Sequence, residues 1–483
     1  MRGIPRVPRI DAMGNVYEGS TQGNGPTWVL CLVTFSVGLF TPSLGPLSFL
    51  LGFLILGTMI FVLLVHILER KQHLYTFPTL IGVLLGGQPF FRDFVMRGFP
   101  AGYLVVDYAV LGLGLLSLPI VVASRFPRAV RSPIWLWGTL CLWTIITLSI
   151  SVDPARGRIF TVLYIDCFLL MLLATHFSRD PRWRSAMLDG VILGALLALG
   201  IAINYYVVTP EEFWRDPESV RFGHTLTSAV QVGTFLYIGT FACILRFLEH
   251  KRLLFSGVIV LVLSSFAFFT FSRGPLIALL AALLVLLSVV NRRSRLPVLF
   301  VIGLSGSVAL SLANAFFPQQ LEDRVTAVDP DRVGQGRLDI WSVSFDMWAE
   351  RPLAGWGAGS YTPVYAEFSW RHPTAPQSIS DAHNMLVQIA VELGVPGLFL
   401  FMASIAGLVT VAWRVKAVPA LAALTYTIVL GVTANWKIPI VYALIAIACM
   451  YIVESLQERE DGAVAPIRSV PSKAHRFLRG GTF

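Results

Sequence analysis

Long apolar runs separated by short polar turns fill most of this chain. Each run is close to the roughly 20 residues that an α-helix needs to cross the hydrocarbon core of a bilayer. The pattern therefore predicts an all-α, polytopic helical membrane protein with about 12 to 14 transmembrane helices, because helices satisfy their own backbone polar groups inside lipid. The predicted spans are residues 27–41, 45–67, 76–90, 102–124, 133–151, 157–176, 185–208, 226–246, 253–271, 275–290, 297–316, 384–412, 418–434 and 438–455.

One large polar segment, residues 317–383, interrupts this series of spans. A protein that only had to cross a bilayer would not need it, so we expect the segment to carry function. It divides the chain into a cytoplasmic N-terminal tail (1–26), an N-terminal transmembrane bundle (27–316), the large loop itself (317–383), C-terminal transmembrane helices (384–456) and a basic cytoplasmic tail (457–483).

Inside the large loop, apolar and aromatic residues recur at helical spacing. They predict a helix from about Leu338 to Glu350 that is ended by Pro352. Its residues Trp341 and Trp348 could pack against the bundle or lie at the lipid interface. The glycine-rich stretch 352–361 is predicted to be a loop that returns toward the membrane.

Composition agrees with the apolar pattern, since 55% of the residues are hydrophobic and 13% are charged, against about 25% charged in soluble proteins. The net charge of +9 could indicate a nucleic-acid partner, but 24 of the 37 basic residues fall in the segments on one predicted side of the membrane. This bias fits the positive-inside rule, which places both termini in the cytoplasm and the large loop outside. The five cysteines lie in apolar spans, so the loop has no disulfide available.

His383 is the strongest candidate for chemistry. It stands at the start of a long apolar helix on the outer side, and a histidine there can accept a proton from a hydroxyl nucleophile. Asp381 could orient the ring or cap the helix that begins near His383 or Asn384. The alternative is a helix-cap or interfacial histidine that makes ordinary hydrogen bonds. His372 is interpreted as a loop residue.

Three arginines, Arg221, Arg273 and Arg337, come from three separate outer segments. Arginine matches phosphate oxygens through its planar fork, so a convergent set would bind a lipid-linked phosphate or pyrophosphate. Salt bridges to nearby acids or contacts with lipid head groups are the alternative for each.

Acidic residues inside apolar spans leave a transporter interpretation open, because such residues can relay protons. They are Asp107, Asp166 and Glu392, for which a structural role is favoured. Glu392 follows His383 by nine residues and should lie on the opposite helix face. The histidine and cysteine spacings match no metal-binding pattern, and the glycine-rich stretch follows no predicted strand, so neither a metal nor a nucleotide cofactor is expected.

Several short motifs follow one another between about 255 and 405. They are Thr270-Phe271-Ser272-Arg273-Gly274-Pro275-Leu276, Gly336-Arg337 with Trp341, Pro352-Leu353-Ala354-Gly355-Trp356-Gly357, His383-Asn384 and Val391-Glu392-Leu393-Gly394-Val395-Pro396-Gly397-Leu398. In order and spacing they resemble the O-antigen ligase and polymerase superfamily of bacterial envelope proteins.

The resemblance implies a metal-independent glycosyltransferase of the bacterial inner membrane with its large loop in the periplasm. Such enzymes move a glycan from undecaprenyl pyrophosphate to an acceptor sugar hydroxyl. By the same resemblance, His383 is the general base, Arg337 and Arg221 bind the pyrophosphate, and Arg273 belongs to the turn Ser272-Arg273-Gly274. Asp381 and Asn384 are supporting residues.

The leading interpretation is an O-antigen ligase whose acceptor is lipid A–core. A repeat-unit polymerase with the same donor chemistry, and a protein oligosaccharyltransferase, remain alternatives. A lipid-linked oligosaccharide flippase or transporter would instead depend on Asp107 or Asp166 and tolerate loss of His383. A non-catalytic assembly scaffold would tolerate all of these substitutions.

Overall fold

The computed structural model describes residues 127–464 apart from 179–180, 209–228, 251–252, 291, 317–321, 323–329, 378, 380 and 434–438, together with the isolated residues Ile81 and Val83. In this part of the chain all regular structure is helical. Seven helices are long and apolar enough to cross a membrane, and three shorter apolar helices accompany them. The predicted all-α, polytopic class is confirmed.

Every span predicted from residue 133 onward corresponds to a helix, whereas the four predicted before residue 127 lie outside the described residues, apart from Ile81 and Val83. The helices are α6 (Arg128–Thr147), η3 (Leu148–Ile150), α7 (Pro154–Phe177), α8 (Pro181–Val208), α10 (Ala229–His250), α11 (Leu253–Phe269), α12 (Arg273–Val289), α13 (Arg292–Phe316), α15 (Pro330–Glu350), α16 (Tyr361–Ser369), α17 (Met385–Val415), α18 (Val418–Thr433) and α19 (Pro439–Val464).

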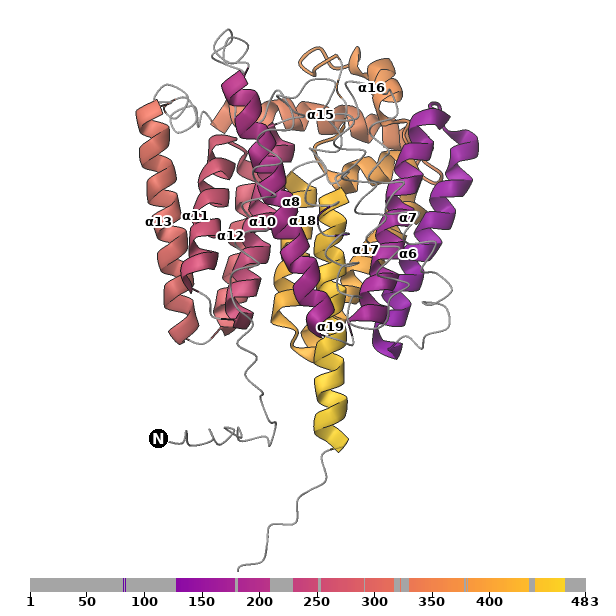
Figure 1. The fold of residues 1–483 in the computed structure, drawn as a ribbon. Helices are drawn as coiled ribbons and strands as arrows, with labels where there is room; N and C mark the ends of the chain where they lie inside the picture. Colours follow the sequence, from indigo (N-terminus) through magenta and orange to yellow (C-terminus); the bar gives the residue numbers. More distant parts are fainter. Residues whose placement is uncertain are drawn as a thin grey trace, which may run out of the picture.

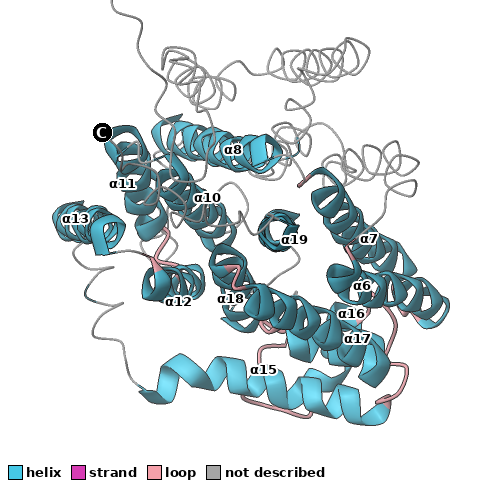
Figure 2. Cartoon of the chain, turned by 90° about the horizontal axis from the view of Figure 1, so that it is seen from below, coloured by secondary structure: helices cyan, strands magenta, loops and turns pink. Residues whose placement is uncertain are grey.

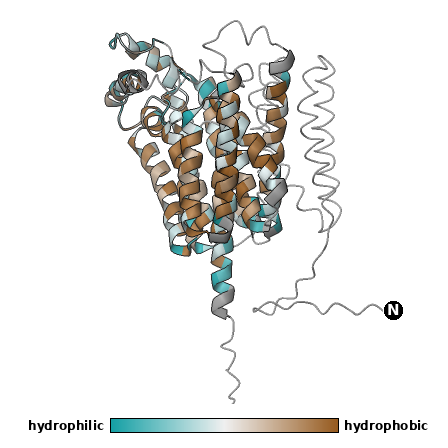
Figure 3. Cartoon of the chain, turned by 90° about the vertical axis from the view of Figure 1, so that its left-hand side faces the viewer, coloured by the Kyte–Doolittle hydropathy of each residue, from teal (hydrophilic) through white to brown (hydrophobic). Residues whose placement is uncertain are grey.

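The spanning helices stand side by side, and α15 and α16 lie at one end of the bundle (Figure 1). Helices from before and after the large loop interlock, because α17 packs on α6, α19 on α7, and α18 on α12. Apolar residues colour the length of the spans, and polar residues gather at their ends and over the loop helices (Figure 3). The two sets of transmembrane helices therefore share one hydrophobic core.

Helix α17 is broken at Gly394, whose φ of 66° lies in the left-handed region. A break frees backbone groups that lipid cannot satisfy. Here the glycine-rich segment satisfies them: Trp356 N donates to Val391 O (3.0 Å), Gly357 N donates to Glu392 O (2.9 Å), and Val395 N donates to Pro352 O (2.9 Å). The stretch 352–361 thus returns to the bundle, as its sequence predicts.

The large loop has a small core of its own. Ile340, Val343 and Met347 of α15 pack against aromatic residues of α16, including Tyr365 and Phe368. The described part of the loop therefore folds around this core, which α15, α16 and the first turns of α17 enclose.

Helix α15 ends at Glu350 as predicted but begins at Pro330, eight residues earlier than expected. Residues 330–337 are mostly polar, so they show no apolar periodicity from which this part of the helix could be predicted. Trp341 and Trp348 are half-buried against the loop core, and Trp341 Nε1 donates to Ala382 O (3.0 Å). Both side chains thus pack on the core of the loop itself.

At the end of the bundle away from α15, ion pairs tie α8, α10 and α19 together. Arg184 pairs with Glu249 (2.8 Å) and with Glu454, and Arg246 makes two hydrogen bonds to Asp189 (2.7 and 2.9 Å). Charged groups near lipid are tolerated when they are paired in this way. The helix ends here carry the basic residues from which the sequence predicts that this end of the bundle faces the cytoplasm.

Candidate active site

His383 lies in the turn that enters α17. Its backbone has a φ of 49°, an uncommon left-handed conformation for a residue with a side chain. Asp381 stabilises this turn, since its Oδ1 accepts a hydrogen bond from the backbone N of His383 (2.9 Å) and lies 3.1 Å from Nδ1 of the imidazole. Asp381 is only 6% exposed, whereas the His383 side chain is 46% exposed. A buried carboxylate therefore holds an accessible imidazole.

The cap of α17 is Asn384, so the predicted capping role of Asp381 is wrong. Asn384 Oδ1 accepts hydrogen bonds from Leu386 N (3.0 Å) and Val387 N (3.3 Å). An N-cap needs extended backbone directly before the first helical residue, and Asn384 has it, with φ −153° and ψ 116°. Because Asn384 caps the helix, Asp381 is left to engage His383.

The contact between Asp381 and His383 favours one of the two neutral tautomers of the ring. A carboxylate beside Nδ1 favours the tautomer that carries its proton there, which leaves the lone pair on Nε2. Among the described residues, no group is hydrogen-bonded to Nε2 of His383. Such an imidazole can take a proton from a hydroxyl group that approaches from the exposed side.

Arg337 lies on α15 with an exposed side chain. It precedes Trp341 by about one helical turn, and Trp341 donates to Ala382 O, the residue next to His383. This hydrogen bond brings the turn of α15 that carries Arg337 beside the chain segment that carries His383.

Arg273 is the first residue of α12 and is also exposed. Its neighbour Gly274 packs so closely on α18 that a Cβ there would lie 3.0 Å from Thr433 Oγ1. Two residues earlier on α18, Gly431 lies against the side chain of Met385, the first residue of α17. The end of α18 therefore stands between the start of α12 and the start of α17, at the end of the bundle that holds His383. Arg221 lies outside the described residues.

Polar groups that the sequence did not single out lie near the turn that holds Asp381 and His383. Tyr361 and Ser344 form a buried hydrogen bond of 2.6 Å between their hydroxyl oxygens. Burial raises the pKa of Tyr365 to about 12 and raises the pKa of Tyr361 further above its ordinary value. Both phenols therefore stay protonated near neutral pH, so neither competes with His383 as a base. No linear motif marks them, because their partners come from different helices.

A second histidine of the loop has a different setting. His372 Nε2 lies 2.8 Å from Asp346 Oδ2, and its Nδ1 lies 3.2 Å from Ser342 Oγ. Ser342 and Asp346 are four residues apart on α15 and so share one face. These contacts fasten the segment after α16 to α15, which is more than the loop role expected for His372.

Two of the three acidic residues in the predicted spans lie in the described part of the chain, and both are buried. Glu392 lies inside the bundle at 2% exposure and accepts a hydrogen bond from Gln388 Nε2 (2.8 Å). Asp166 is also buried in α7. Asp107 lies outside the described residues.

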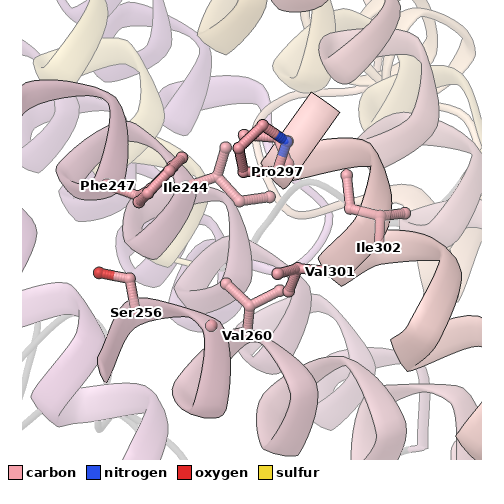
Figure 4. Close-up of a pocket in the computed structure, with 9 residues that line it drawn as sticks. Ile244, Phe247, Ser256, Val260, Pro297, Val301 and Ile302 are labelled. Atoms are coloured by element: carbon pink, nitrogen blue, oxygen red, sulfur yellow. The ribbon is translucent and has the colours of Figure 1, made fainter. Parts of the chain in front are cut away.

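An apolar hollow lies between α10, α11 and α13, near the end of the bundle opposite His383 (Figure 4). None of the described side chains that line it is charged. The hollow is lined by Ile244, Phe247, Ser256, Gly257, Val260, Pro297, Val298, Val301 and Ile302.

The fold and the site together define a class of protein. It is a polytopic membrane protein with an accessible histidine at one end of its spans and arginines at the same end. Residues 257–402 match the family model described as O-antigen ligase, which confirms the resemblance predicted from the motifs. This range contains Arg273, Arg337, Asp381, His383 and Asn384 but not Arg221.

The chain is also similar to a protein of Rickettsia bellii (strain RML369-C) whose name gives it as a candidate polysaccharide ligase. The two are 24% identical over an alignment of 284 residues, which covers 54% of this chain and 64% of the relative. The chain thus spans just under two thirds of the length of the curated relative it matches.

Proposed function

We propose that this protein is a glycan ligase of the bacterial inner membrane. It transfers a saccharide from undecaprenyl pyrophosphate to a hydroxyl group of an acceptor sugar, with lipid A–core as the leading acceptor. The match to O-antigen ligase over residues 257–402 and the likeness to a candidate polysaccharide ligase support a ligase-type function. The donor and the acceptor are those that the resemblance to the superfamily implies.

In the proposed reaction the acceptor oxygen attacks the anomeric carbon of the donor sugar. The bond between that carbon and the pyrophosphate oxygen breaks, and the lipid pyrophosphate leaves with the electron pair. His383 Nε2 takes the acceptor proton as the new glycosidic bond forms. The observation that carries this assignment is the Asp381–His383 contact of 3.1 Å, because it keeps Nε2 as the basic atom.

Negative charge grows on the pyrophosphate as the anomeric bond breaks, so cationic groups placed in advance lower the barrier. We assign this role to Arg337, Arg273 and Arg221. The assignment of Arg337 is supported by its exposure and by the bond from Trp341, one turn further along α15, to Ala382. That of Arg273 is supported by its exposure and by the contacts of α18 with the starts of α12 and α17. Arg221 is carried by the resemblance alone. Because guanidinium groups supply the positive charge, the proposed step needs no metal.

A repeat-unit polymerase would use the same donor and the same base, and would differ in taking a growing glycan as acceptor. Reconstitution of the purified protein with a defined undecaprenyl-pyrophosphate glycan, offered lipid A–core or a second donor molecule, separates the two. A product on lipid A–core supports ligation, and lengthened lipid-linked glycan supports polymerisation.

The His383→Ala variant tests the mechanism in that assay. We expect it to insert normally and to transfer about 10²- to 10⁴-fold more slowly, the usual contribution of a general base. His372→Ala is the matched control, since it removes the other histidine of the described loop and should leave transfer close to wild type. Normal transfer by His383→Ala would remove the general-base assignment. If Asp166→Asn abolished activity while His383→Ala did not, a flippase or transporter would be favoured instead.

A further inference from the structure

Helix α15 runs crosswise to the spans at one end of the bundle (Figure 1). Seen along the bundle axis from the opposite end, much of its length lies beside the described spanning helices rather than behind them (Figure 2). The part of the chain that the structure describes therefore leaves the flank of α15 open where a bilayer surface would meet the protein.

An apolar ridge follows this helix, made of Leu338, Phe345 and, just beyond its end, Leu353. Their exposures are 59%, 56% and 73%. Leu338 and Phe345 are seven residues apart, which places them about 20° apart around the axis and opposite the buried face. The polar contacts of Ser342 and Asp346 with His372 lie on one flank of the ridge. This is the pattern of a helix that lies in a membrane interface.

The length of α17 indicates how deep the ridge lies relative to the hydrocarbon core of the bilayer. It has 31 residues and ends at Val415, whereas about 20 residues are enough to cross the hydrocarbon core. Counting back from Val415 places the boundary of the core near Val395, whose N donates to Pro352 O (2.9 Å). Leu353 follows Pro352 directly, so the end of α15 stands at this boundary.

The exposed surface is also continuous with a face that lipid covers. Val395, Phe399 and Met402 of α17 are 44%, 65% and 51% exposed and recur at helical spacing. They extend from the position bonded to Pro352 into the span. Lipid that contacts this stripe reaches Leu353 at its upper end.

We propose that α15 is an interfacial helix that rests on the bilayer, with Leu338, Phe345 and Leu353 inserted into the leaflet at that end of the bundle. Under the predicted topology this is the outer leaflet. The partner is the phospholipid surface itself. The exposed Arg337, one residue before the ridge begins, then stands at the depth of the lipid phosphates.

Nitroxide accessibility tests the depth directly. Leu338→Cys, Phe345→Cys and Leu353→Cys are labelled in the full chain in nanodiscs of phosphatidylethanolamine and phosphatidylglycerol, with Glu367→Cys as control. Glu367 is an exposed residue of α16 in the same loop. Four native cysteines are buried, and unsubstituted protein taken through the labelling gives the background. The readout is the ratio of collisions with oxygen to collisions with a water-soluble nickel chelate.

We expect this ratio to be several-fold higher at the three ridge positions than at Glu367→Cys, because oxygen concentrates in lipid and the chelate is excluded. Equal ratios at Leu338→Cys, Phe345→Cys and Glu367→Cys would place α15 in water and overturn the proposal, even if Leu353→Cys were lipid-exposed. Low collision rates with both reagents would mean that protein covers the ridge, which also overturns it. The measurement needs no substrate, so its outcome is separate from that of the transfer reaction.

Discussion

At the scale of single residues, the chemistry depends on how two side chains divide their tasks. Asn384 satisfies the first amides of α17, so Asp381 is available to hold both the backbone and the ring of His383. If Asp381 were the cap, nothing else among the described groups would fix the imidazole. The spacing Asp-Ala-His-Asn thus separates helix capping from orientation of the base.

Asp381→Asn tests this division. The new amide oxygen can still accept from the backbone of His383, but the charge beside Nδ1 is lost. A hydrogen bond to a charged group contributes about 1.5–3 kcal/mol, so we expect kcat to fall roughly 10- to 100-fold while KM for the donor changes little. Asp346→Asn, which alters the other Asp–His contact, is the control for steady-state transfer measurements. Equal kcat values in the two variants would contradict the orienting role.

At the scale of elements, the break in α17 and the glycine-rich segment form one joint. A Cβ at Gly394 would lie 2.2 Å from Leu353 O, and a Cβ at Gly357 would lie 2.5 Å from Ser151 Cα. Trp143 Nε1 of α6 donates to Leu393 O at the same place (2.8 Å). The joint therefore fastens α6, α17 and the large loop to one another.

Gly394→Ala should weaken this joint. Its positive φ costs a residue with a side chain about 1–3 kcal/mol, and the added carbon also meets backbone that cannot move aside. We expect a clear fall in the thermal unfolding temperature of the detergent-solubilised protein. Gly303→Ala on α13 is the matched control, because a Cβ there meets nothing within 4 Å. Similar unfolding temperatures for both variants would show that the break is not strained.

At the scale of the whole molecule, interlocking of the two helix sets brings distant segments to one end. Arg273 begins α12, Arg337 lies on α15 and His383 precedes α17, and the end of α18 connects the first to the last. The opposite end collects basic residues at the helix termini, among them Arg128 and Arg414. The site and the basic residues therefore lie at opposite ends of the helix bundle.

The positive-inside rule then predicts the orientation of the whole protein. With Glu367→Cys on α16 and Arg459→Cys on α19, both exposed, a membrane-impermeant maleimide applied to spheroplasts should label the first position at once. The second should be labelled only after lysis. The reverse pattern would place the large loop in the cytoplasm and remove the periplasmic site.

The sequence by itself determined the spans from residue 133 onward, the large loop, the end of α15 at Glu350 and the family resemblance carried by residues such as Arg273 and His383. These follow from hydropathy, helical periodicity and short motifs, which are local properties of the chain. Only the tertiary structure decided that Asn384 caps α17, that α15 starts at Pro330, and that the glycine-rich segment docks on the break at Gly394. The docking depends on hydrogen bonds and close contacts between residues far apart in the chain, which no local pattern encodes. The cap bonds of Asn384 are local, but Asp381 also suited the role, and only the backbone conformation decided between the two. Residues 330–337 form a helix without the apolar periodicity that would predict it.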